Sequence, residues 1–130
     1  MQKHKVFVTR EIPERGLWII KKRFDAEVWI DSAPPPKQVI IQKAVKVDAL
    51  ATLLTDKIDA EVFDVAPNLK IIAQFAVGYD NIDMKEATKR GIYVTNTPGV
   101  LTETTADFAW ALLMAVARRV VEADKYIRAG

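Results

Sequence analysis

Short apolar runs alternate along the chain with segments whose apolar residues recur at helical spacing. The runs are typical of short buried strands, and they lie at 5–9, 27–30, 49–54, 69–75 and 92–95. The segments that predict helices lie at 13–24, 37–46, 59–65 and 83–89, and a longer helix, capped by 102–105, is predicted across 105–128. Strands that alternate with helices favour a parallel sheet. We therefore expect an α/β protein with a doubly wound five-stranded parallel sheet, helices on both of its faces, and a long C-terminal helix.

Each of the first two predicted helices has an inward and an outward face. The inward face of the first follows from residues four apart, Ile12, Gly16, Ile20 and Phe24. The inward residues of the second are Ile40, Ala44 and Val47. By the same periodicity, Trp18 should face solvent among charged residues, and Val45 should lie on the wet side of the second helix.

Half of the residues are hydrophobic, and the charges nearly cancel, with 19 Lys and Arg against 17 Asp and Glu. A charge balance this close to neutral gives no basic surface for nucleic acid. The chain has no cysteine and a single histidine, His4, which excludes disulfides, thiolate metal sites and a histidine metal cluster. Its longest uncharged apolar stretch, 108–117, is about half of what a bilayer requires. These features predict a soluble, cytoplasmic protein with neither a nucleic-acid nor a membrane partner.

Function in a parallel sheet usually lies in loops at the carboxyl ends of the strands. The loop 76–81 is the best candidate, because Gly78 lets a ligand approach the backbone and successive N–H groups can hold a carboxylate. The same loop also fits an ordinary turn in which Gly78 has a positive φ and Asp80 or Asn81 caps the next helix. In the segment 96–107, hydroxyls and N–H groups could meet a phosphate or a polar ring substituent, but the same residues fit a capped helix after a turn, which they favour on their own.

Two motifs of nucleotide chemistry are missing from the chain. Its glycines are too widely spaced for either G-x-G-x-x-G or a P-loop; they are Gly16, Gly78, Gly91, Gly99 and Gly130. Because His4 is the only histidine, the side chain best suited to proton transfer near neutral pH occurs only at the N-terminus. We therefore expect neither a dinucleotide site nor acid–base catalysis within these residues.

Four segments together resemble one enzyme family: VFVTR at 6–10, AQFAVGYDNID at 73–83, GIYVTNTP at 91–98 and TAD at 105–107. In this order they resemble the N-terminal part of the D-2-hydroxyacid dehydrogenases, and within these the archaeal glyoxylate and hydroxypyruvate reductases. The resemblance covers essentially the whole chain. It implies a flavodoxin-like substrate domain at 1–100 and, at 101–130, a helix that leads into the cofactor domain of an NAD(P)H-dependent oxidoreductase.

The resemblance also implies roles for individual residues. Ala76, Val77 and Gly78 would hold the carboxylate of a small 2-oxo acid through backbone N–H groups. Leu54 would line the pocket, and Thr105 would lie near the nicotinamide of NADH or NADPH. The arginine, glutamate and histidine that bind and protonate the substrate in this family come from a later region, as does its glycine-rich cofactor loop. We therefore expect no catalytic residue, no bound cofactor and no activity from these residues alone.

An alternative function rests on apolar residues that should be exposed. Trp18 stands where relatives usually carry a polar side chain, Ile30 ends its strand where an acidic residue is usual, and Val45 lies on a wet helix face. Since Trp is a preferred anchor of binding interfaces, these residues also fit an engineered or repurposed protein-binding module with Trp18 as its anchor. The apolar face of the helix 105–128 likewise needs cover. It should either fold back on its own sheet or pair with a second copy in a symmetric homodimer.

Overall fold

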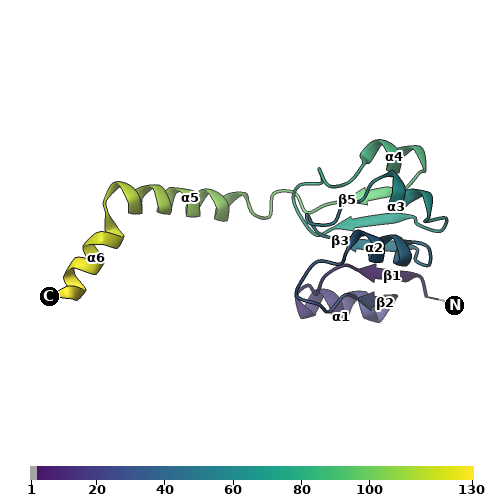
Figure 1. Ribbon diagram of the computed structural model, residues 1–130, viewed down its shortest axis with the longest axis horizontal. Coiled ribbons are helices and arrows are strands. Elements are labelled where there is room, and N and C mark those ends of the chain that lie inside the picture. The colour runs from purple at the N-terminus through teal and green to yellow at the C-terminus, as the bar shows by residue number, and fades with distance from the viewer. Residues whose placement is uncertain (1–2) are drawn as a thin grey trace. The chain divides into compact units, whose positions relative to one another are not determined.

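The computed structural model describes residues 3–130 and divides into two compact units, one ending at Pro98 and one running from Gly99 to Gly130. In the first unit, strands alternate with short helices (Figure 1). The strands are β1 Lys5–Val8, β2 Asp25–Val28, β3 Ala49–Thr52, β4 Ile71–Gln74 and β5 Tyr93–Thr95. The helices of this unit are α1 Glu14–Arg23, α2 Lys37–Ala44, α3 Ala60–Asp64 and α4 Met84–Lys89.

The five strands form one sheet in the order β2-β1-β3-β4-β5, and every neighbouring pair is parallel. β1 lies between β2 and β3, so that Val6 is in register with Ala26 on one side and Ala49 on the other. This is the strand order of flavodoxin-like doubly wound folds. The predicted α/β class and the five-stranded parallel sheet are confirmed.

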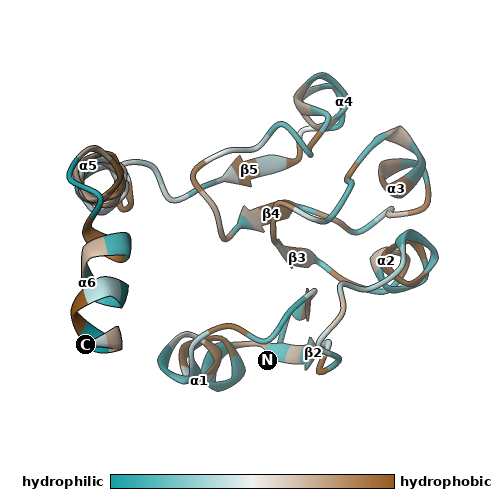
Figure 2. Ribbon diagram, turned by 60° about the vertical axis from the view of Figure 1, so that its left-hand side comes forward, coloured by the Kyte–Doolittle hydropathy of each residue, from teal (hydrophilic) through white to brown (hydrophobic). Residues whose placement is uncertain are grey.

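Side chains along the strands alternate between two apolar layers. On one face, α2, α3 and α4 enclose the larger core, in which Phe7, Leu50 and Ile72 are fully buried. On the other face, α1 covers a smaller core, formed by Val6, Val8, Leu17 and Ala51. Figure 2 shows α1 on one side of the sheet and α2 and α3 on the other. Helices therefore lie on both faces of the sheet, but α1 covers its face only in part, since Ala73 of β4 is exposed.

The predicted inward face of α2 is confirmed, because Ile40, Ala44 and Val47 are all buried. The predicted inward face of α1 is only partly right. Leu17 is its one buried residue, whereas Phe24 is 36% exposed. Gly16 has no side chain to bury, so the apolar stripe is centred on the next residue instead.

β2 begins and ends two residues earlier than predicted, at Asp25–Val28 instead of 27–30. It is an edge strand paired only with β1, so its side chains alternate between exposed and half-buried and carry little apolar signal. The apolar Trp29 and Ile30 follow the strand. The indole N–H of Trp29 donates to the carbonyl of Ala33 at 2.8 Å, and Ile30 is 84% exposed.

The second unit consists of α5 Thr102–Ala117 and α6 Val120–Ala129. The single long helix predicted across 105–128 is therefore wrong in two respects. Arg119 adopts a left-handed φ of 52° between the two helices, and residues 102–105 do not cap the first helix, which begins at Thr102 after Leu101 with no side-chain cap. Neither helix has a buried residue. Within residues 3–130, no helix combines the length and the apolar character that a membrane span needs.

Candidate functional site

The loops that follow β3 and β4 meet at the carboxyl ends of these strands, where Thr52 is in register with Gln74. Leu54 follows β3, and Gly78 lies in the loop after β4. A Cβ atom added at Gly78 would lie 3.6 Å from Cδ2 of Leu54, so the side chain of Leu54 lies beside Gly78. Leu54 remains 58% exposed. The structure therefore brings together the predicted pocket residue and the predicted carboxylate loop at one accessible edge of the sheet.

The loop after β4 presents backbone donors that have no acceptor. Over residues 3–130, the N–H groups of Ala76, Val77, Gly78 and Tyr79 donate no hydrogen bond to another part of the chain. Val77 is 39% exposed and Tyr79 is 46% exposed. Backbone N–H groups are strong donors that seek a partner, and a run of them can hold an anion. The loop therefore has the chemistry of a carboxylate site.

Three successive carbonyl groups of the same loop are occupied. Ala76 O accepts from the N–H of Thr97 at 2.9 Å. Val77 O accepts from Nδ2 of Asn96 at 2.7 Å, and Gly78 O accepts from Nε2 of Gln74 at 3.3 Å. The loop is thus held through its acceptors while its donors stay free.

Gln74 is the buried centre of this arrangement, with 2% of its surface exposed. Its Oε1 accepts from the hydroxyl of Thr52 at 2.7 Å, and its Nε2 donates to Oδ1 of Asn81 at 2.8 Å. Asn81 in turn donates through Nδ2 to the carbonyls of Leu53 and Asp56, at 3.1 and 2.7 Å. A buried amide with all its groups bonded fixes the chain around it, so the loops after β3 and β4 are tied to each other.

Asp56 extends the network to β1. It is 2% exposed, and its Oδ2 accepts from the hydroxyl of Thr9 at 2.5 Å and from the N–H of Leu53 at 2.7 Å. Oδ1 of Asp56 is buried without a partner in the described residues. The carboxylate therefore anchors the backbone that carries Leu54.

A short bridge closes the loop from its far end. Ile58 pairs in parallel with Ile82; the N–H of Ile58 donates to Asn81 O at 2.9 Å, and the N–H of Asp83 donates to Ile58 O at 2.8 Å. Both isoleucines are buried in the larger core. The segment from β4 to α4 is consequently fixed at both of its ends.

The interpretation of this loop as an ordinary turn is wrong in two respects. Gly78 does not have a positive φ; the glycines that do are Gly91, Gly99 and Gly130. The next helix is capped by Asp83, whose carboxylate accepts from the N–H of Glu86 at 3.0 Å, and Asn81 instead joins the buried network. The turn requirement that would have explained Gly78 is therefore absent.

The network residues were missed by the sequence analysis. Gln74 carried the one available signal, because a glutamine inside the apolar run 71–75 needs a partner when buried. Asp56 and Thr9 gave no comparable signal, since their contact spans 47 positions of sequence. Asn96 lies in a segment for which the sequence predicts only a turn before a helix, and its bond to the loop depends on the tertiary placement of β5 beside β4.

Thr105, the residue expected near a nicotinamide, lies in the first turns of α5 in the second unit and is exposed. Its N–H donates to Leu101 O at 2.9 Å within that helix. A dinucleotide needs a glycine-rich turn that leads from a strand into a helix. The described residues have no such turn, so they do not fit a nicotinamide dinucleotide. They also contain no group of three or more His, Cys, Asp or Glu side chains that could hold a metal ion.

Two of the residues proposed for the alternative interface, Trp18 and Val45, lie on opposite faces of the sheet. Trp18 is on α1 and is 60% exposed, with Nζ of Lys22 4.7 Å from its ring centre. Val45 follows α2, on the opposite face of the sheet, and is 44% exposed. The expected exposure of Trp18 is confirmed, but Trp18 and Val45 do not share a surface.

Lys37 links the starts of two helices, because its Nζ lies 2.8 Å from Oδ2 of Asp59 and 2.5 Å from Oε2 of Glu61. Partial burial would raise the pKa of Asp59, but the hydrogen bond and charge of Lys37, aided by Lys57, outweigh burial and leave that pKa below its ordinary value of 3.8. The predicted cap at Asp59 is correct in position only. It makes no side-chain hydrogen bond to the helix and pairs with Lys37 instead.

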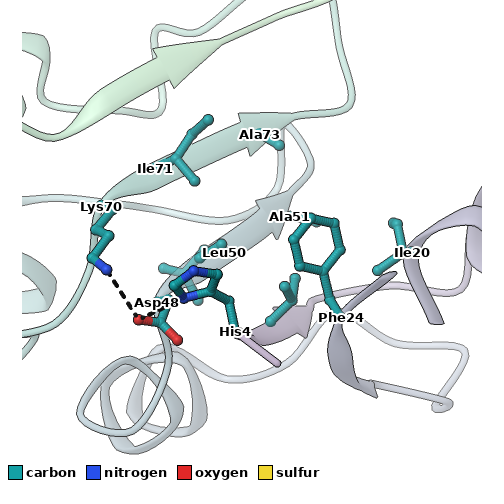
Figure 3. A pocket seen from close by; sticks show the side chains of 11 residues that line it. His4, Ile20, Phe24, Asp48, Leu50, Ala51, Lys70, Ile71 and Ala73 are labelled. Carbon is teal, nitrogen blue, oxygen red and sulfur yellow. Dashed lines mark ion pairs between the residues drawn. The ribbon is translucent and has the colours of Figure 1, made fainter. Parts of the chain in front are cut away.

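A separate hollow of about 290 Å³ lies on the sheet face that α1 covers only in part. Figure 3 shows Phe24 and Ile20 on one side of it and Ile71 and Ala73 on the sheet. At its rim, Oδ1 of Asp48 lies 3.5 Å from His4 and 3.7 Å from Lys70 (Figure 3). Its walls are otherwise apolar, so the hollow has little chemistry to offer a small polar ligand.

The comparison with protein families identifies the fold's lineage. The family described as D-isomer specific 2-hydroxyacid dehydrogenase, catalytic domain, matches residues 6–129. The chain belongs to this family. It is 72% identical to a glyoxylate reductase of Korarchaeum cryptofilum and 63% identical to one of Thermococcus litoralis, each over 128 residues. These matches cover 98% of the chain but only 39% of either relative.

Solved structures of 2-hydroxyacid dehydrogenases and related proteins share the fold. A Thermus thermophilus protein superimposes with a TM-score of 0.87 at 46% identity, covering 97% of this chain and 40% of its own. The NADPH-dependent glyoxylate/hydroxypyruvate reductase of Sinorhizobium meliloti, solved with NADP and malonate, gives a TM-score of 0.77 at 32% identity over 99% of this chain and 39% of its own. The chain thus spans about two fifths of the length of the relatives it matches.

Proposed function

We propose that the chain forms the substrate domain of a glyoxylate-reductase-like 2-hydroxyacid dehydrogenase and binds the carboxylate of a small 2-oxo acid. The free N–H groups of Ala76, Val77 and Gly78 hold the carboxylate, and Leu54 packs against the carbon skeleton. The observation that carries this proposal is the run of unpaired donors beside an exposed Leu54. The glyoxylate reductases among its relatives support the choice of a short 2-oxo acid.

The residues of this chain supply binding but no chemistry. A hydride transfer needs a nicotinamide held in place and an acid to protonate the new alkoxide. The described residues fit no dinucleotide, and the candidate site holds no histidine; its one buried carboxylate, Asp56, is used to anchor backbone. We therefore propose that residues 1–130 alone bind no NAD(P)H and do not reduce glyoxylate or hydroxypyruvate.

Binding is tested by titrating the ¹⁵N-labelled chain with oxamate, an unreactive analogue of a 2-oxo acid. The amide signals of Val77 and Gly78 should shift with the methyl signals of Leu54. Leu54→Ala should weaken the response, whereas Ile30→Ala, which trims an aliphatic side chain that is 84% exposed and lies after β2, should not. Oxamate shifts that avoid the loop would contradict the proposal.

Catalysis is tested separately, by following NADH and NADPH absorbance with glyoxylate or hydroxypyruvate. The expected result is no turnover above the rate without protein. Turnover in a preparation free of longer forms of the enzyme would show that the missing acid and cofactor site are present after all.

A second candidate function, protein binding through Trp18, is favoured by the 60% exposure of this large aromatic side chain. Glu11, Glu14 and Lys21 surround the shallow groove beside it, so an apolar anchor stands within a polar rim. This is the usual anatomy of an interface hot spot. In this interpretation the chain is a binding module that reuses the dehydrogenase fold.

The test of this second function is Trp18→Ala. Binding of a partner through this face should weaken by about 2 kcal/mol or more, while the free energy of unfolding changes by less than about 0.5 kcal/mol, as expected for an exposed residue. Ile19→Ala, on the same helix at 45% exposure, serves as the control. A blue-shifted Trp18 emission in a variant lacking Trp29 and Trp110 would rule out an exposed anchor.

A further inference from the structure

The orientation of the loop after β4 follows from which of its groups are already bonded. A trans peptide group points its carbonyl and its N–H in opposite directions, and the described chain has no cis peptide bond. The carbonyl of each residue shares a peptide group with the N–H of the next. Tying down a carbonyl therefore aims the following N–H the other way.

Three successive carbonyl groups of this loop accept hydrogen bonds. In each case the N–H group of the next residue is left without an acceptor. Ala76 O, held by the backbone of Thr97, frees the N–H of Val77. Val77 O, held by Asn96, frees the N–H of Gly78. Gly78 O, held by Gln74, frees the N–H of Tyr79. All three donors lack an acceptor in the described chain.

Two of these three ties are made by side chains, and both side chains sit on rigid parts of the fold. Gln74 is the last residue of β4, is 2% exposed, and is held in turn by Thr52 and Asn81. Asn96 comes directly after β5. Neither amide is free to rotate without breaking a bond of 2.8 Å or less.

We infer that Gln74 and Asn96 are positioning residues, which aim the N–H groups of Val77, Gly78 and Tyr79 at a single carboxylate. The inference rests on the proposed function and deepens it, because it adds Tyr79 as a donor and says which side chains set the geometry. A carboxylate has about four lone-pair directions, so it can accept all three donors. Gly78 serves this site by leaving the approach to the backbone clear: no positive φ requires a glycine there.

The positioning role is tested in the free chain by residual dipolar couplings, which report the direction of each backbone N–H. Asn96→Ala should change the coupling of Gly78, and Gln74→Met should change that of Tyr79. Thr88→Ala is the matched control, because the Thr88 hydroxyl also bonds a backbone carbonyl at 2.7 Å, on α4 away from the loop. A general loss of stability moves none of these couplings selectively.

Oxamate titrations of the same variants supply the second readout. Each lost tie should weaken binding by about three- to tenfold, the size of one net hydrogen bond, and Thr88→Ala should bind like the wild type. Should Gln74→Met unfold, the Asn96→Ala result decides. Unchanged couplings at Gly78 and Tyr79 in the folded variants overturn the positioning role. A wild-type loop that ignores oxamate overturns the proposed function, and the couplings then still decide whether Gln74 and Asn96 orient the donors.

Discussion

Phe7 and Phe108 are the same amino acid in opposite settings: Phe7 is 1% exposed at the centre of the larger core, and Phe108 on α5 is 64% exposed. The contrast extends to their units. All buried residues of the described chain lie in the unit that ends at Pro98, and none lies in α5 or α6. Yet the sequence of α5 is rich in apolar residues, and Trp110, Leu113 and Val116 are all more than half exposed. An apolar sequence forms a core only where the topology supplies a second surface.

The largest expected effect separates the two phenylalanines. Phe7→Ala should lower the free energy of unfolding by about 3–5 kcal/mol, the cost of removing a fully buried aromatic ring. In a sample dilute enough to be monomeric, the matched change Phe108→Ala should alter it by less than about 0.5 kcal/mol, because removing the exposed ring leaves no cavity. Urea denaturation followed by circular dichroism measures both. Similar losses for the two variants would mean that α5 is covered in the folded monomer.

A second prediction concerns what covers α5. A helix that is apolar around most of its circumference is usually enclosed by other protein, and we propose that a second copy of the chain pairs with it. Light scattering should then show a dimer. Trp110→Glu with Leu113→Glu should weaken association by about thirtyfold or more.

The control for this experiment is Thr104→Glu, which adds a negative charge to the same helix at a polar position. It should leave the dimer intact. A wild-type chain that is monomeric at all accessible concentrations would contradict pairing through α5.

The smallest expected effect lies at the surface of the first unit and depends on pH. Because the pKa of Asp59 is lower in the folded chain than its ordinary value of 3.8, the ionised carboxylate stabilises the fold above about pH 4. That contribution is lost as the pH falls through the folded pKa. Lys37→Met should therefore destabilise the chain at pH 6, and its difference from the wild type should shrink by pH 3.

Lys57→Met provides the comparison for Lys37, since Lys57 is 74% exposed and its Nζ lies 3.6 Å from the same carboxylate. Its effect should be smaller at every pH. Thermal melts of the three proteins between pH 3 and 6 measure these differences. Equal effects of the two lysines would show that Asp59 responds to overall charge and has no preferred partner.

Much of the fold could be predicted because its local and tertiary signals agree. The runs that form β1 and β3 are apolar on both faces, as strands covered on both sides must be, and Gly91 stops α4 in the left-handed conformation expected of it. β2 was misplaced because an edge strand has only one bonded neighbour and a weak apolar pattern. The break between α5 and α6 at Arg119 could not be predicted, because no glycine or proline lies there.

The candidate site was predicted less completely. The loop after β4 and its neighbour Leu54 could be predicted from the position of strand ends and from the family resemblance. The side chains that hold the loop could not, because Gln74 and Asn81 act through partners on β3 and in the loop that follows it. A hydrogen bond between residues far apart in the sequence produces no periodic pattern. Only the polar Gln74 within an apolar run indicated such a bond.

The bridge between Ile58 and Ile82 bears on how a ligand would be bound. Together with the carbonyl ties, it holds the segment from β4 to α4 at both ends and in the middle. Association normally costs free energy when loops and side chains lose freedom on contact. Here that ordering has already been accomplished by folding, so a small anion would give up mainly its own motion and its bound water. The affinity of such a site is limited more by the small size of the ligand than by the ability of the loop to adapt to it.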